Sequence, residues 1–178
     1  LSSIGHYHRA ARMPDPTTDA GVRYVMAGIR RVLGRRPDQA TPLMPPLLFD
    51  AMDTCPTVYT GPAGPEPNLR GLRDRAILLV GFVGALRRSE IVAANLEDLH
   101  DHPSGMVLDI PRSKTNPDRS KPDTVVLPRS RTPEHCPVEQ LQNWIDSAGI
   151  TSGPLFVGST PRGNHLTTRR LAGDSINS

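Results

Sequence analysis

Three residues near the middle of the chain have the types and spacing needed to hold a phosphate group. Arg87 and Arg88 are adjacent, and Glu90 follows within one helical turn. A planar guanidinium can clamp two phosphate oxygens at once, and a nearby carboxylate can pair with it. The solvated start of an ordinary helix shows the same pattern, so the spacing alone leaves both interpretations open.

The segment before Arg87 is the most hydrophobic of the chain. Residues 70–85 are apolar on nearly every side, which predicts a buried helix, and a second helix is expected over 88–94. The apolar run is about half as long as a membrane span requires. We therefore expect Arg87 at the end of a rigid, water-poor helix, where burial is costly but strengthens the field of the guanidinium.

A second polar segment contains both lysines of the chain, Lys114 and Lys121. Two short strands, 106–110 and 124–127, are expected on either side of this long polar tip. Since every other long basic side chain is Arg, we expect that lysine is kept here for chemistry that an ammonium performs better, such as proton donation. For Lys121 we favour a tip charge or a phosphate contact.

The amino-terminal part of the chain is basic, although the net charge is only +3. Residues 1–40 contain Asp15, Asp19 and Asp38 as acidic residues, against Arg9, Arg12, Arg23, Arg30, Arg31, Arg35 and Arg36. Such an excess predicts a polyanionic partner such as nucleic acid, with a solvated arginine-rich face as the alternative. Apolar residues at helical spacing predict an amphipathic helix over 18–33, capped by Thr18 or Asp19 and ended by Gly34.

Composition divides the chain into two parts and a linker. Residues 1–36 hold two expected helices, residues 37–46 are a polar, Pro-rich linker, and residues 47–178 form the second domain. We expect a loop at 56–68, which is rich in Pro and Gly, and a helix at 137–149. The two cysteines have no metal or disulfide spacing, and no signal peptide is visible, so we expect a cytoplasmic protein.

The segment "LRDRAILLVGFVGALRRSEIVAANLEDL" resembles the first box of the tyrosine recombinases, the phage-integrase family. That box combines Arg-Asp-x-Ala, an apolar run, Gly-Leu-Arg-x-Ser-Glu-Leu and an acidic pair, here Glu97 and Asp98. Ala85 replaces the usual Gly, a mild departure in a helical context. The resemblance implies that Arg87 is the first catalytic arginine and Glu90 a supporting carboxylate.

The hairpin extends the resemblance. The sequence Arg112-Ser113-Lys114-Thr115 is similar to the family's lysine segment, which implies that Lys114 is the general acid for the leaving 5′ oxygen. Residues 1–36 look like the end of the helical core-binding domain, which closes on DNA together with the catalytic domain. The residues expected to contact DNA are Arg12, Arg30, Arg31, Arg88, Arg112 and Lys121.

The resemblance covers nearly the whole chain and implies its fold and function. The fold is expected to be mainly α with a small antiparallel hairpin or sheet (α+β), an incomplete recombinase catalytic domain. Members cut and rejoin double-stranded DNA through a 3′-phosphotyrosine, without metal or nucleotide cofactor, as tetramers. The expected localisation is cytoplasmic and nucleoid-associated, with no membrane partner.

The family's His-x-x-Arg box and nucleophilic Tyr have no counterpart in the chain. Tyr7, Tyr24 and Tyr59 all precede Arg87, on the wrong side for the family's order. We therefore expect a truncated, inactive, DNA-binding piece of a site-specific recombinase or integrase, possessing no nucleophile of its own. The alternatives are a complete non-catalytic DNA-binding protein built on half a recombinase fold, and a helical interaction module.

Overall fold

The chain forms two compact units, Leu1–Pro42 and Leu43–Ser178, which are described separately. The computed structural model describes residues 2–34, 41–110, 123–160 and 165–177. The boundary between the units lies within the segment 37–46 that composition marks as a linker. The assignment of the units to a core-binding and a catalytic domain stays a prediction.

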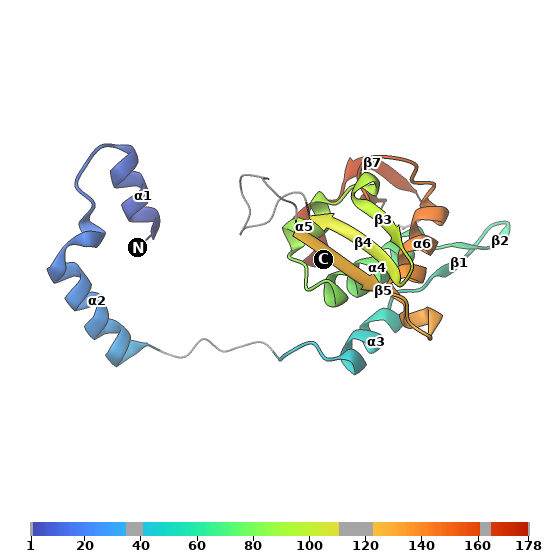
Figure 1. Cartoon of the computed structure of the whole chain (residues 1–178), viewed down its shortest axis with the longest axis horizontal. Coiled ribbons are helices and arrows are strands. Elements are labelled where there is room, and N and C mark those ends of the chain that lie inside the picture. The colour runs from blue at the N-terminus through green and yellow to red at the C-terminus, as the bar shows by residue number, and fades with distance from the viewer. Residues whose placement is uncertain (1, 35–40, 111–122, 161–164, 178) are drawn as a thin grey trace. The chain divides into compact units, whose positions relative to one another are not determined.

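The first unit contains two helices, α1 (Ser2–Ala10) and α2 (Ala20–Leu33), with a 3-10 turn, η1 (Pro16–Thr18), between them (Figure 1). Helix α2 begins as expected, because the Asp19 side chain accepts hydrogen bonds from the first backbone N–H groups of the helix. Its amphipathic pattern is present, but none of its residues is buried within the described parts of the chain. The exposed apolar residues of α2 are Val22, Val25, Ile29, Val32 and Leu33.

The second unit combines helices with small antiparallel sheets (Figure 1), which confirms the predicted α+β class. Its helices are α3 (Pro45–Asp53), α4 (Leu69–Val83), α5 (Arg88–Ala93) and α6 (Pro137–Ala148), with short 3-10 turns η2 (Leu96–Asp98), η3 (Pro133–His135) and η4 (Gly173–Asn177). Its strands are β1 (Val58–Gly61), β2 (Gly64–Pro67), β3 (Leu99–His102), β4 (Gly105–Ile110), β5 (Asp123–Pro128), β6 (Val157–Ser159) and β7 (Leu166–Arg170).

The core of the second unit lies between the sheet β3-β4-β5 and the helices α4 and α6, which pack against each other. Strand β4 is the central strand, and its alternate residues Met106, Leu108 and Ile110 are buried. Helix α6 buries Trp144 completely, and the indole N–H donates to the Leu155 carbonyl at 2.9 Å. The helix predicted at 137–149 is thereby confirmed.

The Pro- and Gly-rich segment 56–68 forms a hairpin, so the prediction of a plain loop is wrong. Strands β1 and β2 pair from Val58 opposite Pro67 to Gly61 opposite Gly64, and the Tyr59 hydroxyl donates to the Glu66 carboxylate. Proline is tolerated here because a two-stranded ribbon has outer edges that need no N–H donor. The short strands β3 and β7 also were not predicted.

Helix α4 ends in a Schellman motif with alanine at its left-handed position. The N–H of Leu86 donates to the Gly81 carbonyl at 3.0 Å, and the N–H of Ala85 donates to the Phe82 carbonyl at 3.2 Å. Ala85 has a φ of 48°, a conformation that favours glycine. The expected helical context at Ala85 is therefore wrong, because the chain reverses there.

Candidate functional site

Arg87 lies on the surface at the start of α5, and its side chain is 53% exposed. The expectation of a water-poor guanidinium at the end of the apolar helix is wrong. Helix α4 ends at Val83, and the reversal at Ala85 carries the chain out of the core before Arg87 is reached. Arg87 is therefore accessible to a ligand, and its guanidinium has a small desolvation penalty in the folded chain.

The buried partner is Glu90, which is 6% exposed. One carboxylate oxygen accepts from the backbone N–H of Arg87 at 2.8 Å, and the other accepts from the Arg87 Nη1 at 2.7 Å. These bonds compensate the buried charge and fix the start of α5 together with the guanidinium. Glu90 thus orients the Arg87 guanidinium through a direct ion pair.

An open pocket of about 500 Å³ lies beside Arg87. It is lined by Arg87, Arg88, Ser89 and Val92 from α5 and by Gly173 and Asp174 from η4. Two guanidinium groups and a hydroxyl face a single carboxylate across this space, which suits an anion with several oxygens, such as a phosphate. The contribution of η4 was not predicted, because no sequence pattern connects positions so far apart in the chain.

The acidic pair after α5 has a structural role. Asp98 accepts from the backbone N–H of Asn95 at 2.9 Å, and Glu97 accepts from the backbone N–H of Gly153 at 2.8 Å. The Gly153 N–H, followed by the N–H of Glu97 itself, lowers the pKa of the Glu97 carboxyl from its usual value. The Glu97 bond connects the end of the first box to the segment that follows α6, and the Asp98 bond caps the η2 turn.

The strands β4 and β5 form the predicted hairpin, and Ile110 pairs with Asp123 at its last described position. Arg112, Lys114 and Lys121 lie outside the described residues. Their predicted roles, and the distance between Arg87 and Lys114, therefore stay predictions.

The three arginines predicted to contact DNA from the first unit are exposed. Arg12 follows α1 with a φ of 55°, and Arg30 and Arg31 lie in the last turn of α2, where their charge is favourable to the helix dipole. These three side chains belong to the first unit, whereas Arg87 and its pocket belong to the second unit.

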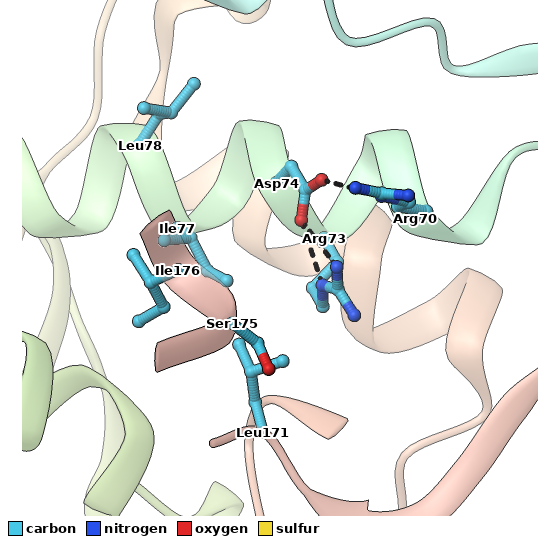
Figure 2. A pocket seen from close by; sticks show the side chains of 8 residues that line it. All are labelled: Arg70, Arg73, Asp74, Ile77, Leu78, Leu171, Ser175 and Ile176. Carbon is cyan, nitrogen blue, oxygen red and sulfur yellow. Dashed lines mark hydrogen bonds and ion pairs between the residues drawn. The ribbon is translucent and has the colours of Figure 1, made fainter. Parts of the chain in front are cut away.

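A second hollow, of about 160 Å³, lies beside Arg73 on α4 (Figure 2). Arg73 is almost fully buried; its guanidinium donates to Asp74 at 2.8 and 2.9 Å and to the Val157 carbonyl at 3.1 Å. Figure 2 shows Asp74 between Arg70 and Arg73, so one carboxylate faces both cations. Arg73 thus connects α4 to β6, a structural role that the Arg-Asp motif did not reveal.

The described residues also bear on metal binding and on membrane insertion. Within residues 2–34, 41–110, 123–160 and 165–177, no group of three or more His, Cys, Asp or Glu side chains is arranged to hold a metal ion. Among the helices of these same ranges, none is both long enough and apolar enough to span a membrane.

The chain is similar to a curated protein of a bacterium. It is 32% identical over 179 aligned positions to a Selenomonas ruminantium protein named "Integrase/recombinase xerD homolog". The alignment covers 99% of this chain and 49% of that protein, so the chain spans about half the length of the relative. No family model matches the chain.

Proposed function

We propose that the Arg87 pocket of this member of the tyrosine recombinase family binds a backbone phosphate of double-stranded DNA, and that its role is recombination-related. The observation that carries the proposal is the orientation of Arg87 by the buried Glu90 carboxylate. This bond leaves the remaining guanidinium donors at the pocket that Arg88 shares. Contacts to phosphates supply position and affinity without reading the base sequence.

The resemblance supports a wider proposal for the whole protein. Arg87 and Lys114 act on the same phosphate, with Lys114 as the general acid, and the protein cuts and rejoins DNA through a 3′-phosphotyrosine. Further phosphate contacts come from Arg12, Arg30, Arg31, Arg88, Arg112 and Lys121. The covalent intermediate conserves the bond energy, so the reaction requires no metal or nucleotide. A tetramer on two duplexes, associated with the nucleoid, belongs to the same proposal.

We propose that these 178 residues do not cleave DNA alone. The hydroxyl of Tyr59 is engaged by Glu66 in the β1–β2 hairpin, and Tyr7 and Tyr24 lie in the first unit. None of the three follows Arg87 in the order that the family uses. A covalent complex trapped on a nicked duplex would contradict this proposal.

The DNA-binding proposal is tested by fluorescence anisotropy of the full chain with a labelled duplex over a range of salt concentrations. We expect Arg87→Ala to lower the affinity roughly tenfold and the slope of log K against log salt by about 0.9, the value of one phosphate contact. Arg131→Ala is the matched control, because Arg131 is an exposed arginine outside the pocket. Equal losses in both variants would assign no special role to Arg87, and salt-independent binding would favour a helical interaction module.

A further inference from the structure

Arg170, the last residue of β7, makes a cluster of hydrogen bonds to the end of α5. Its Nη1 donates to the Val92 carbonyl at 2.7 Å and to the Ala94 carbonyl at 3.0 Å. Its Nη2 donates to the side-chain oxygen of Asn95 at 2.5 Å. The contact connects residues more than seventy positions apart in the chain.

The end of α5 needs such a partner. The helix has only six residues; the Ala94 N–H caps the carbonyls of Glu90 and Ile91, and Arg170 supplies a donor to the Val92 carbonyl. A positive charge at a helix carboxyl end is also favourable to the dipole. Glu90 holds the first turn of α5 and Arg170 holds the last, so the whole helix is fixed from both ends.

Arg170 also lies shortly before η4, which forms the second wall of the Arg87 pocket beside α5. After it come Leu171, which is buried in the core, and then Gly173 and Asp174, which line the pocket together with residues of α5. The bonds from Arg170 to α5 therefore set the spacing between the two walls. Each wall is a short segment, since α5 has six residues and η4 has five.

We propose that Arg170 is a positioning residue that holds the two walls of the phosphate pocket at a fixed separation. This role rests on the proposed DNA-binding function. Arg170 acts through α5, because three of its five N–H donors are directed to two carbonyls and an amide oxygen at the end of that helix.

The test is a double-mutant cycle on the full chain, with duplex affinity measured at one fixed salt concentration. We expect Arg170→Gln to weaken binding roughly five- to tenfold in the wild-type background. In the Arg87→Ala background the same change is expected to have less than about a twofold effect, because both changes remove the same contact. Arg169→Gln is the matched control: it removes an equal charge from the neighbouring, exposed position of β7.

Two further readouts separate positioning from other roles. Additive losses in the cycle would mean that Arg170 contacts DNA itself, and would overturn the proposal. Arg170→Lys keeps the charge but cannot span the same acceptors, so we expect it to restore part of the affinity. Amide hydrogen exchange is expected to be faster over residues 89–92 in Arg170→Gln than in the wild type, and unchanged exchange there would overturn the proposal.

The outcomes also separate this proposal from the proposed function. If Arg87→Ala leaves DNA affinity unchanged, the phosphate pocket itself is refuted. If Arg87→Ala weakens binding while Arg170→Gln matches the Arg169→Gln control, the pocket stands and only the positioning role is refuted.

Discussion

At the scale of single residues, the site depends on an exposed arginine held by a buried carboxylate. The Glu90 side chain is only 6% exposed and therefore loses most of its contacts with water. Two hydrogen bonds from Arg87 replace part of them. Such a pair contributes mainly through geometry, because removal of either member leaves the other without its partner. Its value lies in presenting the guanidinium in one orientation.

We expect Glu90→Gln to lower the free energy of unfolding by about 1–3 kcal/mol, because the neutral amide makes weaker bonds to the Arg87 N–H groups. Urea denaturation measures the change. Glu139→Gln is the control, since Glu139 pairs with Arg129 on the surface, where both side chains are about half exposed, and such pairs contribute about 0–1 kcal/mol. Equal effects of the two substitutions would show that burial of Glu90 adds nothing.

Glu97 predicts a dependence of stability on pH. Its pKa in the folded chain is lowered, chiefly by the Gly153 N–H, so its contribution is present above the usual pKa and is lost as the pH falls through the folded value. We expect the melting temperature of the wild type to fall below about pH 4.5, and to fall less steeply in Glu97→Gln. Parallel pH profiles for the two proteins would contradict this assignment.

At the scale of the elements, the reversal between α4 and α5 decides where the arginine lies. The left-handed residue at Ala85 ends one helix, and two residues later Arg87 opens the next. Gly81 supports the same corner, because a Cβ added there would lie 3.0 Å from the Ile91 side chain on α5. The geometry of this corner therefore places the Arg87 guanidinium outside the core.

We expect Ala85→Gly to raise the free energy of unfolding by about 0.5–1 kcal/mol. Relief of the left-handed strain, about 1–2 kcal/mol, exceeds the added flexibility of the unfolded chain. Gly149→Ala is the converse control at the end of α6, where φ is 63° and a Cβ would meet open space; we expect it to be destabilising by a similar amount. Destabilisation by Ala85→Gly would show that Ala85 is not strained.

The elements that the sequence predicts well are those marked by local patterns of apolar residues and by capping residues. Helices α2 and α6 follow from apolar periodicity with caps at Asp19 and Gly149, and the hairpin strands β4 and β5 follow from alternation. The exposure of Arg87 was missed because a single backbone reversal at an alanine has no composition signal. The pairing of Arg170 with α5, and the strands β1 and β2, depend on tertiary or cross-strand contacts that local patterns do not encode.

At the scale of the whole molecule, two units of different character share one chain. The first is basic and leaves the apolar residues of α2 exposed, while the second has a continuous core. We predict that both contact DNA, in the way that the family's clamp implies. Because the chain spans about half of its curated relative, strand exchange and assembly belong to the proposal for the whole protein.

NMR of the arginine Nε–H signals during titration with duplex DNA is the most direct test of whether the Arg87 guanidinium contacts a DNA phosphate. The Arg87 signal is identified by its loss in Arg87→Lys, and the buried Arg73 signal serves as an internal reference. We predict that the Arg87 signal shifts in proportion to the amount of DNA bound, while the Arg73 signal stays in place. A saturated complex in which the Arg87 signal has not moved would contradict it.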